Sequence, residues 1–489
     1  MTRQTHASSR PAPPAPPRPA PAEPRPYNFP RFERRTLSNG VRLVVAPVHK
    51  LPLVTAIALV DAGAAEDPEG REGLAQLTAR ALTEGTASAD GAALTERVER
   101  LGTSIDASAD WDTALVRMTV GAGRLSEAMA LFGEVLRAPS FPERELERLK
   151  AERLAEILAQ RAEPRGLADE MFDRFAYATG ARYGRPEGGA AEAVTALGRA
   201  DVEAFYRERY RPDATTLVIV GDVSVHDAER VAREVFGSWA ADGERGAGSG
   251  ERAARPGEGP PPRSALRARR PLDEASPSPR AVHVVEKTDA PQSELRVGHV
   301  GVPRKHPDYF PITVMNAILG GLFSSRINLN LREAHGYTYG AHSGYEWRRG
   351  AGPFSISTAV RSDVTDAAAR EVLAEVDRMR SAPVAADELS LATSYLDGVF
   401  PIRYETTSAI ASALANLVLY GLPDDYYDRY RSVVRAVSAG DVLEAARRHL
   451  APDRFQIVVV GDPAAIRAPL EALGAGPVRV YDAEGRQRR

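Results

Sequence analysis

The stretch GLAQLTARALTEGT, residues 73–86, is the part of the chain from which the fold is best inferred. Its apolar residues Leu74, Leu77 and Ala81 recur three and four positions apart, which predicts an amphipathic helix. An alternating apolar run precedes it, so we expect the helix to pack directly on a sheet. The chemical character of this helix then depends on the polar positions between its apolar residues.

Positions three and four apart share one face of a helix, and here Gln76, Ala79 and Arg80 share such a face. A His-x-x-Glu-His segment at this spacing would supply two metal-binding imidazoles and a carboxylate that acts as general base. Glutamine is a poor zinc ligand, alanine is none, and the permanent charge of arginine repels a dication. We therefore expect no metal and no cofactor on this chain.

The surroundings of this helix resemble the pitrilysin/insulinase family of zinc peptidases, which includes the mitochondrial processing peptidase and bacterial homologues. The resemblance is carried by Gly73-Leu74-Ala75, Gly85-Thr86, the upstream segment 37–43 (LSNGVRL) and Leu51-Pro52-Leu53. In that family the segment reads GLAHxxEH and ends in GT. The resemblance therefore implies a peptidase-like chain whose zinc motif has lost both histidines and the glutamate.

The family's third zinc ligand is a glutamate on a later helix, and counting from Arg80 this position falls on Glu156. The resemblance thus assigns Gln76, Ala79, Arg80 and Glu156 to a degenerate zinc motif. Without the resemblance, Glu156 is a solvated carboxylate on a charged helix.

A second group of residues lies far along the chain, where Arg332 ends a predicted helix and Tyr339 follows across a glycine turn into a strand. A guanidinium and a phenol can converge on one peptide carbonyl or stabilise an oxyanion. The family carries an Arg/Tyr pair with this role in its second half, and the resemblance places it on Arg332 and Tyr339. The structural alternative is an arginine that caps a helix and a half-buried strand tyrosine.

The chain repeats itself at an offset of 240 residues without a gap, which predicts two homologous halves. In each copy a helix, a Pro-Asp turn and a buried strand that ends in Gly-Asp follow one another. The matched residues are Asp201, Val202, Arg207, Pro212, Asp213, Val218, Val220, Gly221 and Asp222 with Asp441, Val442, Arg447, Pro452, Asp453, Val458, Val460, Gly461 and Asp462.

We expect an α+β fold in which each half packs helices on a mostly antiparallel sheet and the two halves form a clamshell. The predicted divisions are a disordered Pro/Ala-rich tail (1–31), an N-terminal half (32–242), a flexible linker (243–280), a C-terminal half (281–474) and a C-terminal tail (475–489).

Composition limits the function classes. The net charge of −3 gives no basic excess, so we infer no nucleic-acid partner. The absence of cysteine excludes disulfides and thiolate chemistry. The N-terminus lacks the apolar region of a secretory signal, and no apolar run approaches the length of a membrane span. Cytoplasm and periplasm both stay open.

The sequence favours a non-catalytic, substrate-binding subunit of a zinc metallopeptidase, a pseudoenzyme that supplies Arg332 and Tyr339 to a zinc-bearing homologous partner for peptide hydrolysis in a heterodimer. The zinc is then expected on the partner. One alternative is a structural scaffold subunit of a larger complex. Another is an active zinc endopeptidase with non-standard ligands, which the scattered histidines do not favour, since none form a pair four residues apart on a helix.

Overall fold

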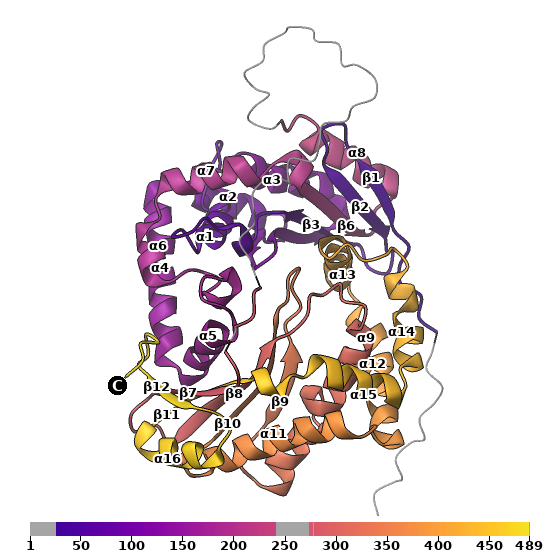
Figure 1. The fold of residues 1–489 in the computed structure, drawn as a ribbon. Helices are drawn as coiled ribbons and strands as arrows, with labels where there is room; N and C mark the ends of the chain where they lie inside the picture. Colours follow the sequence, from indigo (N-terminus) through magenta and orange to yellow (C-terminus); the bar gives the residue numbers. More distant parts are fainter. Residues whose placement is uncertain (1–25, 241–272, 277, 489) are drawn as a thin grey trace, which may run out of the picture.

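The computed structural model describes residues 26–240, 273–276 and 278–488. Two six-stranded sheets stand at opposite ends of the molecule, one in each half of the chain (Figure 1). The α+β fold of two halves is confirmed.

The N-terminal sheet has the strand order β1-β2-β6-β3-β5-β4, and only the β2–β6 pair is parallel. Its strands are β1 (Glu33–Thr36), β2 (Arg42–Pro47), β3 (Leu53–Val60), β4 (Asp106–Ala109), β5 (Ala114–Gly121) and β6 (Thr215–Gly221). The helices of this half are α1 (Leu74–Ala81), α2 (Gly91–Glu99), α3 (Leu125–Arg137), α4 (Glu143–Ala162), α5 (Pro164–Ala176), α6 (Ala191–Ala196), α7 (Arg199–Arg209) and α8 (Val225–Phe236).

The C-terminal sheet has the order β12-β7-β11-β8-β10-β9, with β7 parallel to both of its neighbours. Its strands are β7 (Ala281–Glu286), β8 (Gln292–Val300), β9 (Ala341–Tyr345), β10 (Pro353–Arg361), β11 (Gln456–Gly461) and β12 (Val478–Tyr481). Its helical elements are α9 (Tyr309–Asn316), η6 (Ala317–Gly321), α10 (Arg326–Asn328), η7 (Leu329–Ala334), α11 (Thr365–Ser381), α12 (Ala386–Arg403), α13 (Thr407–Leu419), α14 (Tyr426–Ala436), α15 (Ala439–His449) and α16 (Pro463–Leu473).

The repeated residues occupy equivalent places in the two halves. Asp201 lies in the first turn of α7, and its carboxylate accepts a 2.9 Å hydrogen bond from the Gly198 backbone N–H that precedes the helix. Asp441 makes the same 2.9 Å bond to Ser438 at the start of α15. Because this bond satisfies a backbone donor that the helix leaves free, the repeated aspartate starts the helix that leads into β6 or β11.

Each half sends one helix across to the other half. Helix α5 packs on β8 and β11 of the C-terminal sheet, and α13 packs on β3 and β6 of the N-terminal sheet (Figure 1). Strand β6 is therefore buried on both faces. Side chains alternate along a strand, so Leu217 faces the core of its own half while Val218 faces the core shared with α13.

Most of the expected N-terminal tail, residues 1–25, lies outside the described residues, but two described segments near the ends of the chain contact the rest of the fold. Residues 26–31, part of the expected tail, cross to the other half, where the Phe29 ring is buried and stacks on Tyr427 at 4.5 Å. The Tyr27 hydroxyl also donates to the Tyr404 carbonyl at 3.0 Å. The expected C-terminal tail contains β12, which pairs with β7. Apolar burial and backbone pairing order both segments, and short segments of this kind carry little periodicity.

The expected linker lies mostly outside the described residues, but its described end contacts the N-terminal half. The backbone N–H of Ala178 donates to the Glu274 carbonyl at 2.8 Å, and Ala275 bridges Tyr177. This places residues 273–276 against the end of α5.

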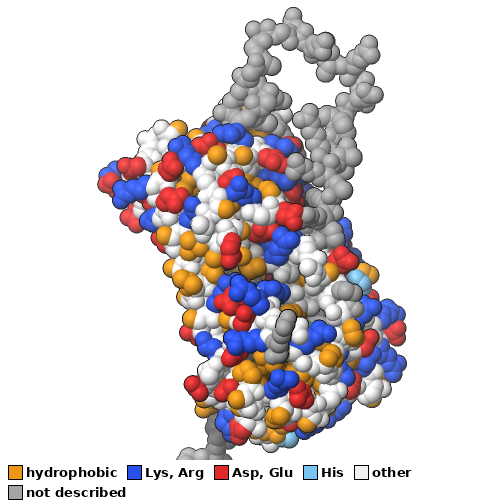
Figure 2. Space-filling model, turned by 60° about the vertical axis from the view of Figure 1, so that its left-hand side comes forward, with side chains coloured by type: hydrophobic (Ala, Val, Ile, Leu, Met, Phe, Trp, Pro, Cys, Tyr) orange, Lys and Arg blue, Asp and Glu red, His pale blue; other side chains and the backbone are white. Residues whose placement is uncertain are grey.

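One segment of the described residues, Tyr309–Ala334, is long and apolar enough to cross a membrane by length and composition. Half of its apolar window is buried inside the fold, where Ile312 and Leu319 join the C-terminal core. A buried core helix meets the same criteria, so the segment is weak evidence for a span. On the face shown in Figure 2, acidic and basic side chains are intermixed over both halves.

Candidate functional site

Helix α1 is held at its N-terminus by Asp67. The Asp67 carboxylate accepts 2.8 Å hydrogen bonds from the backbone N–H groups of Gly73 and Ala75, and Arg182 pairs with it at 3.1 Å. Gly73 has a φ of 98°, a conformation that glycine adopts without strain. Burial raises the pKa of Asp67 to about 6 despite these partners. The start of α1, and hence the direction of its polar face, is fixed by this carboxylate.

The degenerate motif positions Arg80 and Glu156 lie in contact. Arg80, on α1, donates from Nη1 to Glu156 on α4 at 3.0 Å and from Nη2 to Glu152 at 3.2 Å. Arg153 approaches the other oxygen of Glu156 at 3.3 Å. Glu156 is thus paired with two guanidinium groups, and its side chain is also 48% exposed, as the alternative of a solvated helix carboxylate predicts.

These residues do not fit a zinc ion. The Ala79 side chain is fully buried and has no donor atom, Arg80 brings a positive charge, and the Glu156 charge is already compensated. Zinc binds imidazole, thiolate and free carboxylate groups. The donor set at α1 therefore offers one amide, from Gln76, and a carboxylate held by arginines.

The Gln76 side chain lines a cavity of about 300 Å³, to which both halves of the chain contribute residues. The Gln76 side chain hydrogen-bonds to Glu187, in the loop that closes over α1. Gly188 permits this approach, since a Cβ there would lie 2.3 Å from Gln76 Oε1. The cavity is lined by Gln76, Trp111, Arg153, Gln160, Asp169, Glu170, Asp173, Arg185, Pro186, Glu187, Gly188, Glu346 and Arg348.

The C-terminal half contributes Arg348 to this cavity. Its guanidinium lies 4.5 Å from the Trp111 ring centre and 4.6 Å from that of Tyr183, and it donates to Glu346 at 2.9 Å. Arg348 is buried, so these ring contacts and the ion pair compensate a charge withdrawn from water. No spacing in the sequence relates Arg348 to α1, and sequence reasoning missed this residue for that reason.

Two carboxyl groups of the cavity resist ionisation. Burial raises the pKa of Asp173 to about 7, although Arg348 opposes the shift. Burial also raises the pKa of Glu187 to about 7, and the nearby Asp110 charge adds to the effect. The Asp173 side chain is 28% exposed and lines the cavity, and its surroundings disfavour the charged form of the carboxyl group. Near neutral pH the cavity therefore holds a mixture of protonated and ionised carboxyl groups.

Arg332 and Tyr339 lie on the surface of the C-terminal half. The Arg332 guanidinium stacks 4.6 Å from the centre of the Phe323 ring and lies 3.5 Å from Glu333. Tyr339 lies just before β9 and is 95% exposed, not half-buried in a strand. Within the part of the chain that the structure describes, no hydrogen bond joins Tyr339 to another residue.

Two family models match consecutive parts of the chain. The family model described as Insulinase (Peptidase family M16) matches residues 44–184, and that described as Peptidase M16 inactive domain matches residues 196–396. An uncharacterized zinc protease of Mycobacterium bovis is 24% identical over 474 residues, which is 93% of this chain and 98% of that protein.

A probable mitochondrial-processing peptidase subunit beta of Schizosaccharomyces pombe is 28% identical over 60% of this chain and 59% of its own length. Among solved structures, a peptidase M16 inactive domain from Pseudomonas fluorescens aligns with a TM-score of 0.78 at 25% identity, covering 89% of this chain and 99% of that one. A protease from Helicobacter pylori shares the fold, with a TM-score of 0.77 at 17% identity over 89% of this chain and 100% of that one.

Proposed function

Since this chain belongs to the insulinase family of peptidases, family M16, we propose that it is a non-catalytic, substrate-binding subunit that acts with a zinc-bearing homologue. The observation that carries the proposal is the Arg80–Glu156 ion pair, which stands at two positions where a catalytic member needs zinc ligands. Bound zinc lowers the pKa of a water molecule to about 7. This chain has no donor set at α1 for that ion, so the nucleophile must come from the partner.

The exposed surface around Tyr339 supports a role in substrate binding. A tyrosine kept only for packing would bury its ring, whereas Tyr339 leaves both ring and hydroxyl free for another molecule. The Arg332 guanidinium stacks on the Phe323 ring, the Arg332 side chain is 34% exposed, and a guanidinium can donate to a peptide carbonyl. In this proposal the pair holds the backbone of a peptide that the partner's zinc site cleaves.

The alternatives differ in what they require of these residues. A structural scaffold needs neither an accessible Arg332 nor an exposed Tyr339. An active endopeptidase with non-standard ligands needs free donors near α1, and the guanidinium groups of Arg80 and Arg153 occupy Glu156 there. We therefore place the scaffold second and the independent enzyme third.

The test is an assay of the complex formed with the zinc-bearing homologue. Arg332→Ala and Tyr339→Phe should each lower turnover by about 10²–10³, the usual effect of losing an oxyanion-type donor, while assembly and melting temperature stay unchanged. Tyr395→Phe, which alters another exposed tyrosine, is the matched control. Unchanged turnover per assembled complex in both test variants would favour the scaffold.

A further inference from the structure

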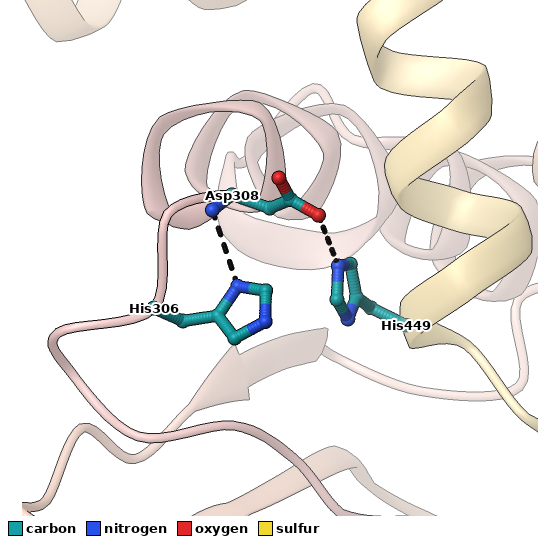
Figure 3. A group of neighbouring side chains, drawn as sticks. All are labelled: His306, Asp308 and His449. Atoms are coloured by element: carbon teal, nitrogen blue, oxygen red, sulfur yellow. Dashed lines mark hydrogen bonds and ion pairs between the residues drawn. The ribbon is translucent and has the colours of Figure 1, made fainter.

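Three side chains of metal-binding type meet in the C-terminal half, far from α1 in the sequence. His306 lies in the loop before α9, Asp308 immediately precedes α9, and His449 is the last residue of α15. One possible ligand atom from each residue lies within 4.8 Å of the others. Figure 3 shows the two imidazole rings side by side, with the Asp308 carboxylate directed toward His449.

We propose that His306, Asp308 and His449 form a binding site for a divalent transition-metal ion, with zinc as the best match. Two imidazoles and one carboxylate are ligands that zinc accepts, and a water molecule can complete a tetrahedral site. The site belongs to this chain alone and is independent of the function proposed above.

The spacing needs only a small adjustment to admit an ion. The His449 Nε2 and Asp308 Oδ2 atoms are 2.7 Å apart and share a hydrogen bond. Two ligand atoms at about 2.0 Å from a tetrahedral metal are about 3.3 Å apart, so they must separate by about half an ångström. Metal binding requires a free lone pair on Nε2, so a neutral His449 then carries its N–H on Nδ1, whereas an imidazolium releases the Nε2 proton to solvent.

His306 can join because its ring is already directed at this group. The centres of the two imidazole rings are 4.9 Å apart, and the ring planes are nearly perpendicular. The Nδ1 lone pair of His306 accepts the Asp308 backbone N–H at 3.1 Å, and the metal would take this lone pair in exchange. Because His306 lies in a loop, its ring can make this adjustment without moving a helix.

One cation competes for the site. Arg448 Nη1 lies 3.5 Å from Asp308 Oδ2, but Arg448 also donates to Glu444 at 2.7 Å. The arginine therefore keeps an ionic partner when a metal takes Asp308. Its removal should strengthen metal binding, because an arginine near the ligands repels a dication.

A bound ion would connect the last turn of α15 to the residues that immediately precede α9, and these two helices pack together. The consequence is a C-terminal half that is stabilised by metal, since a ligand that binds only the folded state raises the melting temperature.

The experiment titrates the untagged full chain with metal ions. Calorimetry measures the binding of zinc, and visible absorption measures the binding of cobalt. We expect one ion per chain and a rise in melting temperature. His306→Ala, His449→Ala and the isosteric Asp308→Asn should each weaken binding at least tenfold, while Arg448→Ala should strengthen it. His226→Ala, at an exposed histidine on α8, and Glu156→Gln are controls that should leave affinity unchanged.

Two results would overturn the proposal. One is the absence of saturable zinc uptake by the wild-type chain when the free zinc concentration is about 100 times a dissociation constant of about 1 μM. At that concentration a specific site would be filled. The other is equal affinity in the His226→Ala and His449→Ala variants, which would assign the uptake to scattered surface groups. The Asp308→Asn change preserves side-chain volume, so this variant keeps the test valid if an alanine variant fails to fold.

Discussion

Arg80 and Glu156 form a 3.0 Å ion pair between α1 and α4, although 76 residues separate them in the chain. A second arginine, Arg153, lies beside the same carboxylate. Positive charge from two side chains thus compensates Glu156 at the place where the family resemblance implies a zinc ligand. The pair is partly exposed, so its role is to complement charge and not to add much stability.

Reintroducing the missing ligands should restore metal binding at α1. The substitutions Gln76→His and Arg80→His place two imidazoles near Glu156, and the chain that carries them should bind zinc. The same chain also carries His449→Ala, which removes the separate C-terminal cluster. Adding Ala79→Glu supplies a base, but Ala79 is fully buried, so we expect a cost of about 1–3 kcal/mol in stability.

Zinc titration and thermal melting measure both effects. A further Glu156→Gln change is the control and should abolish the acquired binding. If the folded chain with Gln76→His, Arg80→His and His449→Ala takes up no zinc, Glu156 does not occupy the ligand position.

The chain alone should cleave no peptide. Gln76, Ala79 and Arg80 provide neither an imidazole pair nor a general base, and without these there is no activated water at α1. Incubation with a peptide library, with and without a chelator, checks this expectation. Chelator-sensitive cleavage that persists in the His449→Ala chain would contradict it and favour an enzyme with non-standard ligands.

The raised pKa of Asp173 predicts a pH-dependent cost to stability. Its pKa is about 4 in an unfolded chain and about 7 in the fold, so the folded state binds more protons between these values. The contribution of this group to the free energy of unfolding is therefore largest below about pH 4, and it falls as the pH rises to about 7. Asp173→Asn should raise the melting temperature at pH 8 and have less effect at pH 5.

Melting curves across this range test the sign. Asp363→Asn is the control, because Arg361 lowers the pKa of that exposed carboxylate and its substitution should bring no gain at high pH. An Asp173→Asn difference that stays constant with pH would show that burial does not hold the carboxyl neutral.

Phe29 should stabilise the contact between the two halves. Its ring is buried, stacks on Tyr427 and meets Tyr404 edge-on at 5.6 Å. Phe29→Ala should destabilise the fold by about 3–5 kcal/mol, as in other buried phenylalanine truncations. Thermal melting measures the change against Phe323→Ala, which removes a ring that is 71% exposed. Equal melting temperatures in both variants would mean that residues 26–31 leave this surface.

Residue order and residue type are enough to predict the class of fold and the chemical deficit at α1. Periodicity predicts α1 because helical spacing is a local property, and the 240-residue repeat predicts two halves because similar residues form similar capping bonds and strands, as at Asp201 and Asp441. The loss of metal donors at Gln76, Ala79 and Arg80 can be read from residue type alone.

The surroundings of these residues depend on how the two halves pack. The exchange of α5 and α13, the entry of Arg348 into the cavity beside Gln76, and the meeting of Asp308 with His449 across 141 residues all arise from that packing. The spacing of residues within one segment does not predict such contacts, because burial and complementary charge between distant segments determine which side chains meet. The same packing leaves Tyr339 exposed, where its position near a strand predicts partial burial.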